Sequence, residues 1–368
     1  MRKNRKIYII IIFYPNMKVL QTKEIIPAKL DLKDKKILYL LSKNARNSYG
    51  RIAKEVGLSS DAVAYRIKSY EKGSLITGYG VSVDISKFNY NVYHLFVRLN
   101  NPKPVVENIF SEKLKMLSFT RAVIKLNGSF DFEIAFIAKN ILDLESKLSE
   151  IFEISQNQIK SYELLIITKN YLEKTFPISF FPDGFYVKEN KKINFSKNLV
   201  KKDFQILKII SKDSSCSLVD IASKIKLSAD IVRYRLDNLT KSLNLSFFPI
   251  INYDSIGYNI HIILLNIKNF NPANEKKLNL FLQTDKNILW VVKTIGKYNL
   301  LLYTCTKEEK EVQKTLKQLR SMFPEEISDY EYLFAEEEIK YTYLPECIFK
   351  EMKLPTTASC GVSKFMKS

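Results

Sequence analysis

Hydrophobic residues recur at helical spacing between residues 34 and 72, with polar residues between them. The pattern predicts three short helices, because apolar side chains three and four residues apart share one helical face. Ser48 and Ser59 stand where the second and third helices would begin, and serine is a favoured N-cap residue. Gly57 offers the turn between them a permissive backbone, so we predict a helix-turn-helix, with residues 73–84 forming a two-stranded wing. The apolar helix positions are Ile37, Leu38, Leu41, Ile52, Ala53, Val56, Val63, Ile67 and Tyr70.

Residues 79–175 show a different hydrophobic pattern, in which short apolar runs alternate with segments of helical periodicity. The runs predict strands, and Asn127-Gly128 between two of them predicts a hairpin. The order strand–helix–strand–strand–helix–strand is the ferredoxin-like arrangement. The expected elements are a strand at 92–99, a helix at 104–117, a hairpin at 120–138, a helix at 141–152 and a last strand at 159–168.

The sequence contains this two-domain unit twice. Residues 61–66 read DAVAYR, and residues 230–235 read DIVRYR. Residues 34–72 align without gaps on residues 203–241, with 15 identities in 39 positions. A repeat of about 170 residues is too long for a solenoid, so it indicates duplication of a whole unit.

The predicted fold class is therefore α+β, with two copies of a winged helix-turn-helix domain followed by a ferredoxin-like βαββαβ domain. Met17 is an alternative start within an N-terminal extension whose apolar run, residues 7–14, is too short to span a bilayer. We therefore expect no membrane association. The expected order is extension 1–28, helix-turn-helix 29–78, ferredoxin-like domain 79–175, linker 176–198, divergent helix-turn-helix 199–246, ferredoxin-like domain 247–345 and flexible tail 346–368.

Positive charge concentrates in the two predicted helix-turn-helix segments. The chain carries 58 Lys and Arg against 39 Asp and Glu, a net charge of +19. Residues 29–78 account for +6 and residues 199–246 for +4, whereas residues 79–175 and 247–345 are close to neutral. We call the helix-turn-helix domains the heads and the ferredoxin-like domains the bodies. Basic heads on neutral bodies indicate salt-dependent attraction to a polyanion such as double-stranded DNA.

The sequence lacks the motifs and residue clusters that several classes of catalytic and metal site need. The sequence has neither a P-loop nor a dinucleotide fingerprint. His94 and His261 lie inside apolar strands, where a core role is more common than a ligand role. We therefore expect no metal, no cofactor and no enzymatic activity. The cysteines form no close pair, which argues against a structural zinc site and suits a reducing cytoplasm; they are Cys216, Cys305, Cys347 and Cys360.

Three motifs resemble those of the Lrp/AsnC family of transcription regulators in order and spacing. They are LDLKDKKIL (30–38), NARNSYGRIAKEVGLSSDAVAYRIKSYEKGSLITGY (44–79) and NGSFD (127–131). The resemblance is close over residues 30–175 and loose over 199–345. It implies a DNA-binding winged helix-turn-helix and a ferredoxin-like domain that dimerises. In many members this domain senses an amino acid or another small molecule, and the dimers often form larger rings.

The third helix of each head carries the candidate DNA contacts, because such a helix enters the major groove. Arg66 and Lys68 could pair with phosphates, and Ser60 and Tyr65 could hydrogen-bond bases or backbone. The candidate side chains are Ser60, Asp61, Ala64, Tyr65, Arg66 and Lys68 in the first head and Arg233, Tyr234 and Arg235 in the second.

Some of these side chains have a second interpretation. Asp61 and Asp230 would also stabilise the helix N-termini through the dipole, by about 0.3–1 kcal/mol each. Tyr65 and Tyr234 would also suit packing against a neighbouring helix. The whole helix could also be the solvated face of a protein-binding winged helix.

The resemblance places an effector site near the hairpin turn, where Gly128, Phe130 and Asp131 would line it. A hairpin that needs a glycine and a polar cap is an equally good interpretation.

The second copy departs from the first in its turns. Gly57 becomes Lys226, and Asp131 becomes Asn299. The segment 71–76, with its glycine before the wing, becomes 240–245 without one. We therefore expect the second head to fold but to read DNA less well.

Two other function classes remain open. Siroheme decarboxylases share this two-domain unit, in some cases fused as two units, and use His and Arg residues to handle an acidic tetrapyrrole. The near-neutral domains here, with one histidine each, would be a poor cradle for a polycarboxylate. A protein-binding or purely sensory module is the other class.

The duplication also predicts symmetry within one chain. The 23 residues of the linker could extend about 75 Å, enough to cross one domain. We expect the ferredoxin-like domains to pair as an intramolecular pseudo-dimer, which would suit an asymmetric operator. The resemblance also implies that pseudo-dimers could associate into a higher homo-oligomer.

Overall fold

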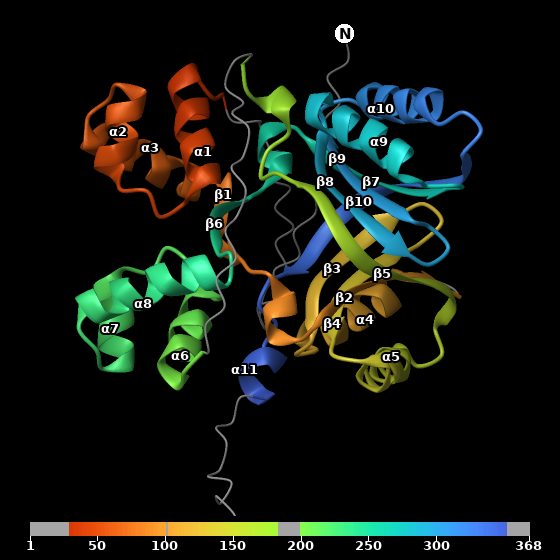
Figure 1. The fold of residues 1–368 in the computed structure, drawn as a ribbon, viewed down its shortest axis with the longest axis horizontal. Helices are drawn as coiled ribbons and strands as arrows, with labels where there is room; N and C mark the ends of the chain where they lie inside the picture. Colours follow the sequence, from red (N-terminus) through yellow and green to blue (C-terminus); the bar gives the residue numbers. More distant parts are fainter. Residues whose placement is uncertain (1–28, 101, 183–198, 352–368) are drawn as a thin grey trace, which may run out of the picture.

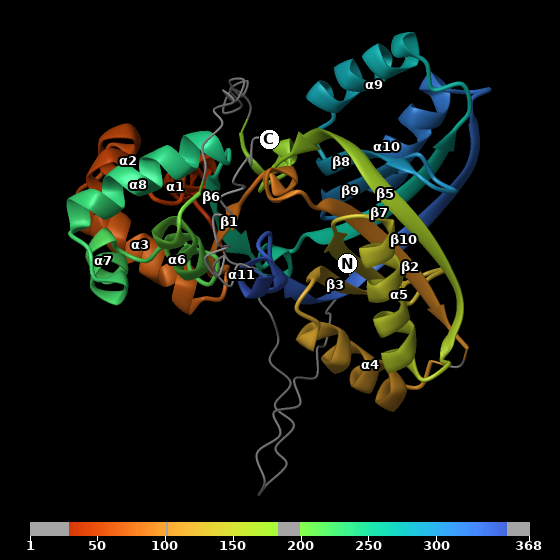
Figure 2. The same cartoon turned by 60° about the horizontal axis from the view of Figure 1, so that its bottom comes forward.

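The computed structural model describes residues 29–100, 102–182 and 199–351. The chain forms two parts (Figure 1): two helical heads lie on one side, and a barrel of strands flanked by helices lies on the other. Figure 2 shows the same separation from a second direction. The N-terminal extension, with the alternative start Met17, lies outside the described residues.

Each head is a three-helix domain whose second and third helices begin directly after a serine cap. The first contains α1 (Leu32–Lys43), α2 (Tyr49–Val56) and α3 (Ser60–Lys72), and the second contains α6 (Lys201–Ile210), α7 (Leu218–Ile225) and α8 (Ala229–Ser242). Ser48 and Ser59 accept hydrogen bonds from backbone N–H groups of α2 and α3. Ser217 and Ser228 do the same for α7 and α8. The helix-turn-helix prediction is confirmed in both copies.

The turn before the third helix keeps its conformation although its residue changes. Gly57 has a φ of +69° and Lys226 a φ of +55°, so both are left-handed. A side chain in this region carries a steric cost of about 1–2 kcal/mol that glycine avoids. The second head therefore folds like the first at a modest cost in stability.

The two-stranded wing expected at residues 73–84 does not form, so that prediction is wrong. One strand lies there, β1 (Ile76–Ser82), and it pairs antiparallel with β6 (Ser246–Ile251) of the other copy. Gly73 has a φ of −78°, which any residue adopts, so its loss in the second copy changes little. The apolar pattern revealed the strand but could not reveal a partner in the other copy.

The body domains follow the predicted ferredoxin-like order. The first contains β2 (Asn91–Leu99), α4 (Pro104–Met116), β3 (Thr120–Asn127), β4 (Phe132–Ala138), α5 (Ile141–Ser155) and β5 (Ile159–Glu173). The second contains β7 (Asn259–Ile267), α9 (Pro272–Thr284), β8 (Ile288–Ile295), β9 (Leu300–Thr306), α10 (Glu309–Met322) and β10 (Ile327–Tyr341). Short 3-10 turns, η1 (Ile85–Phe88) and η3 (Tyr253–Ile256), lead into the domains.

The long strands β5 and β10 join the two sheets into one closed barrel, in the order β10-β3-β4-β2-β5-β8-β9-β7. The first part of β5 pairs with β2 of its own copy, and its last part, from Ile166 to Glu173, pairs with β8 of the other copy. β10 divides in the same way between β7 and β3. The two domains thus pair within one chain, as predicted. The expected last strand, 159–168, was too short because the partner of its extra residues belongs to the other copy.

Each head rests on the body of the other copy. The core of the first head continues into Ile256 and Tyr258, which belong to the second copy. The core of the second head continues into Ile85 and Phe88 of the first. The heads and bodies are therefore exchanged, as the long strands are.

Two segments expected to lie outside the folded domains begin with packed residues. Phe176 and Phe180, at the start of the linker, stack with ring centroids 4.5 Å apart and are buried in the core of the first head. Cys347 and Ile348, in the short helix α11 (Cys347–Glu351) of the expected tail, are also buried. The flexible tail therefore cannot begin at residue 346, and the remainder of the linker and tail lies outside the described residues.

Two glycines stand where the hairpin tips meet the exchanged strands. Gly128 has a φ of +144°, and a Cβ there would lie 2.7 Å from Leu333 Cδ2 of β10. Gly296 has a φ of +146°, and a Cβ there would lie 2.6 Å from the Leu164 carbonyl oxygen of β5. Both glycines are needed because the two copies approach each other closely at these points.

Replacing Gly128 by alanine should therefore destabilise the barrel. We expect Gly128→Ala to lower the free energy of unfolding by about 1–3 kcal/mol or more, through backbone strain and overlap with β10. Gly50→Ala, on α2, is the matched control, because its Cβ would meet only Ser60 Oγ at an ordinary contact distance of 3.7 Å. That change should raise stability by up to about 1 kcal/mol. Urea unfolding measures both, and a tolerated Gly128→Ala would contradict the close approach.

Candidate nucleic-acid interface

The third helix of each head presents one face to solvent, opposite its buried apolar positions. Tyr65 is 76% exposed and Tyr234 is 69% exposed. These values rule out the interpretation of the two tyrosines as packing residues. Exposed on α3 and α8 are Ser60, Asp61, Tyr65, Lys68, Asp230, Arg233 and Tyr234, with Ala64 half-buried.

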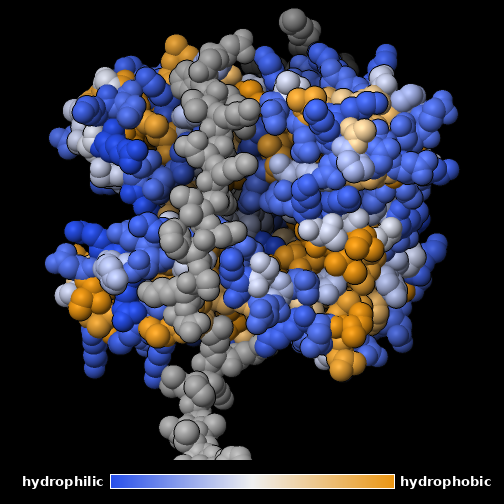
Figure 3. Space-filling view, viewed as in Figure 1, coloured by the Kyte–Doolittle hydropathy of each residue, from blue (hydrophilic) through white to orange (hydrophobic). Residues whose placement is uncertain are grey.

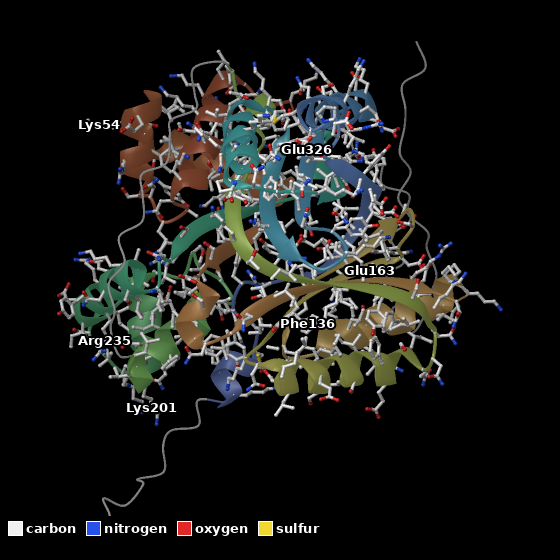
Figure 4. All side chains as sticks on the ribbon, turned by 45° about the vertical axis from the view of Figure 1, so that its right-hand side comes forward. Lys54, Phe136, Glu163, Lys201, Arg235 and Glu326 are labelled. Atoms are coloured by element: carbon white, nitrogen blue, oxygen red, sulfur yellow. The ribbon has the colours of Figure 1, made fainter. Side chains whose placement is uncertain are left out.

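Arg66 and Arg235 do not belong to this exposed face. The Arg66 Nη1 lies 2.8 Å from Asp31 Oδ2 and 2.5 Å from Asp34 Oδ1, at the start of α1. Arg235, labelled in Figure 4, makes the matching ion pair with Asp203 at 2.9 Å. Both arginines hold the third helix against the first, and their expected contact with DNA stays a prediction.

Asp34 is the centre of a larger network in the first head. Its Oδ1 also accepts a hydrogen bond from the Tyr70 hydroxyl at 2.6 Å. The backbone N–H of Asp34, helped by Arg66, lowers the pKa of Asp31. Burial, together with the Asp34 carboxylate, raises the pKa of Tyr70. The second head has valine and leucine in the places of Asp31 and Tyr70, so its network is smaller.

The exposed faces of α3 and α8 differ in charge and size. Ala64 on α3 corresponds to Arg233 on α8, and Lys68 corresponds to Asp237. Arg233 is 3.6 Å from Asp230 in its own helix, an exposed pair that constrains it little. The two heads therefore offer different donors at equivalent positions.

The heads are tied together behind these helices. The backbone N–H of Ala45 donates to the Phe247 carbonyl, and that of Ser214 donates to the Tyr79 carbonyl, each at 2.9 Å. Arg46 Nη1 donates to the Ser214 carbonyl at 2.6 Å. Sequence reasoning missed Arg46, because its partner comes from the other copy and nothing near it in sequence marks it.

The candidate effector residues have structural roles in the hairpin. Gly128 gives the close approach described above, and Phe130 is buried in the barrel. Asp131 Oδ2 accepts a hydrogen bond from the Leu99 N–H at 2.6 Å. In the second copy Asn299 accepts the equivalent backbone bond at 2.9 Å. The change from aspartate to asparagine therefore preserves the turn, and the hairpin interpretation explains these residues.

Both histidines are buried and hydrogen-bonded. His94 Nδ1 lies 2.5 Å from Glu133 Oε1, and His261 Nδ1 lies 2.8 Å from the Tyr332 hydroxyl. Within the part of the chain that the structure describes, no three His, Cys, Asp or Glu side chains are grouped as a metal site would need. Over the same residues, no helix has the length and apolar character needed to cross a membrane.

Comparison with known proteins assigns both heads. A model of the AsnC-type helix-turn-helix domain matches residues 30–71, and a model of winged helix-turn-helix DNA-binding domains matches residues 199–242. The transcriptional regulator LrpA of Pyrococcus horikoshii is 32% identical over 120 residues, 33% of this chain and 84% of its own length. An uncharacterised HTH-type transcriptional regulator of the same organism is 30% identical over 124 residues, 33% of this chain and 78% of its own.

One solved structure resembles nearly the whole chain. The siroheme decarboxylase NirDL superposes with a TM-score of 0.57 at 13% identity, covering 87% of this chain and 97% of its own. At this identity the likeness establishes the tandem fold and nothing about activity.

Replacing Arg66 and replacing Lys68, the two basic residues compared on α3, should have different effects on the free energy of unfolding. Arg66→Ala leaves the Asp34 carboxylate without its cation, so we expect a loss of about 1–3 kcal/mol in unfolding free energy. Lys68→Ala removes an exposed side chain and should change it by less than about 0.5 kcal/mol. Thermal unfolding followed by circular dichroism measures both. Equal, small effects would contradict the structural role of Arg66.

Proposed function

Since the chain belongs to the Lrp/AsnC family of transcription regulators, we propose that it is a cytoplasmic regulator that binds specific DNA sites with both heads. The observation that carries this proposal is the pair of exposed third helices, each on a basic head and on the same side of the molecule (Figure 1). In such domains the third helix reads base edges, while surrounding basic residues contact phosphates.

The charge distribution supports DNA as the partner. Hydrophilic side chains dominate the visible surface of both heads (Figure 3), and exposed lysines such as Lys54 on α2 add to the charge of the first head. The bodies carry almost no net charge. A polyanion would therefore be attracted to the heads rather than to the barrel.

The proposed contacts differ between the heads. Ser60, Tyr65 and Lys68 would face the groove in the first head, and Arg233 and Tyr234 in the second. Asp61, at the helix N-terminus, is assigned to the dipole rather than to DNA. Two half-sites about one helical turn apart, 34–36 Å, would then carry different sequences. A single chain suits such an asymmetric operator, because it always supplies one head of each kind.

Further association would use the body. Apolar side chains gather over α4 and α5 (Figure 3), and we propose this face for higher homo-oligomers of the pseudo-dimer. The exposed members are Val105, Ile109, Met116, Ile141 and Leu142. The corresponding α10 of the second copy is largely polar, so the association would use one face of each chain.

A siroheme decarboxylase is the second candidate, favoured by the whole-chain likeness in fold. Its substrate class carries many carboxylates, which would need a basic cradle. The barrel interior instead presents the buried carboxylate of Glu133. We therefore rank this activity below DNA binding.

DNA binding should depend steeply on salt. If the heads neutralise several phosphates, log affinity should fall linearly with log salt, with a slope of about −0.9 per phosphate. Fluorescence anisotropy with a duplex from the upstream region of the protein's own gene would measure the slope. Lys68→Ala should reduce its magnitude by about 1. No binding at low salt, together with tetrapyrrole absorbance in the purified protein, would instead support the decarboxylase.

The two heads should protect different half-sites. The double change Tyr65→Ala with Lys68→Ala should weaken one half-site, and Arg233→Ala with Tyr234→Ala should weaken the other. Each lost base contact is worth about 1–3 kcal/mol. Footprinting of the three proteins on one operator would show which bases lose protection. Identical footprints for both double variants would contradict the assignment of one head to each half-site.

A further inference from the structure

The barrel interior contains a polar cluster that DNA binding does not use. Glu133 on β4 is 1% exposed, and its Oε1 accepts a hydrogen bond from the Tyr303 hydroxyl and lies 2.5 Å from His94 Nδ1. β4 and β9, which carry Glu133 and Tyr303, stand four strands apart in either direction around the ring. The two side chains therefore meet across the barrel and link the two copies. We call Glu133, His94, Tyr303 and Trp290 the Glu133 cluster.

The second carboxylate oxygen of Glu133, Oε2, has no hydrogen-bond partner among the described residues. Among the described residues, Oε2 is buried and makes no hydrogen bond, and no lysine or arginine forms an ion pair with Glu133. A buried carboxylate without full pairing costs several kcal/mol. Such a group is retained at a cost to stability, which is typical of a binding site.

The cluster lies beside space that solvent reaches. Trp290 and Tyr303 are half-buried rather than buried, although both project into a closed barrel. Their rings lie 5.1 Å apart, and the Trp290 ring lies 5.4 Å from that of His94. An eight-stranded barrel is wide enough to hold one small ligand. Apolar residues fill the interior beyond the cluster, among them Phe96, Leu165, Ile262 and Tyr298.

The surroundings of the cluster are acidic and aromatic. Tyr341, 41% exposed, and Glu338 lie near enough to Tyr303 to raise its pKa further, after burial and Glu133. Desolvation raises the pKa of Glu338 to about 7, and no described lysine or arginine forms an ion pair with it. Arg121 lies over the Tyr343 ring at 4.9 Å. The carboxylates beside the cluster thus lack cations of their own.

We propose that the barrel binds a small organic cation, such as a protonated amine, between Glu133 and the rings of Trp290 and Tyr303. The unpaired Oε2 would attract the charge of the cation and accept an N–H group where the cation has one, and the aromatic faces would attract its charge as well. Because the cluster draws on both copies, such a ligand contacts both halves of the chain. This proposal does not rest on DNA binding.

Trp290 makes the site directly observable, because it is the single tryptophan of the chain. The full chain, without DNA, would be titrated with n-butylammonium and choline while tryptophan fluorescence is recorded. Butanol and butyrate, of similar size, are the uncharged and anionic controls. We expect a saturable change with the cations and none with the controls.

Variants then test whether the fluorescence change arises from binding at the Glu133 cluster. Glu133→Gln should weaken cation affinity about tenfold or more. Glu336→Gln is the matched control, because Glu336 lies on the same strand as Glu338 but already pairs with Lys125 at 3.5 Å. Glu338→Gln is a second test if Glu133→Gln fails to fold, and it should weaken binding several-fold. An equal response to butyrate, no response to either cation, or unchanged affinity in the folded variants would overturn the proposal.

Discussion

The exchange of backbone hydrogen bonds along β5 and β10 is the constraint on which the rest of the structure depends. Each strand satisfies one part of its length within its own copy and the other part in the opposite copy. The barrel that results is closed, so neither sheet ends in a free edge strand. The exchange also sets the close approach that requires Gly128 and Gly296, and it brings each head onto the other body.

Duplication within one chain changes what the two copies are free to become. Two identical chains must present identical heads, whereas here Lys68 corresponds to Asp237 and Ala64 to Arg233. The same freedom applies inside the barrel, where Glu133 corresponds to a leucine in the second copy. The copies have diverged on the exposed faces of the heads, in the network around Asp34 and in the Glu133 cluster, whereas the serine caps, the hairpin bonds and the arginine–aspartate pairs of the heads are kept in both copies.

The third helix of the first head shows that two neighbouring basic residues need not share one face. Arg66 and Lys68 are two positions apart, yet one is paired with carboxylates on α1 and the other is exposed. The helical turn places the two residues on different faces of α3. The position of α1, known only from the tertiary structure, decides that Arg66 is the one paired with carboxylates. The set of side chains proposed to face DNA is therefore smaller than spacing suggested, and it is more aromatic.

The sequence by itself determined the features that depend on neighbours within a few residues. Helix positions, the caps Ser48 and Ser59, the domain order and the duplication all follow from local periodicity and self-comparison. Tertiary structure decided what depends on partners far along the chain: β1 with β6, the end of β5, Arg66 with Asp34, and Glu133 with Tyr303. The physical reason is that a helix satisfies its hydrogen bonds within one turn, whereas strand edges and buried charges take partners that only the folded chain brings together.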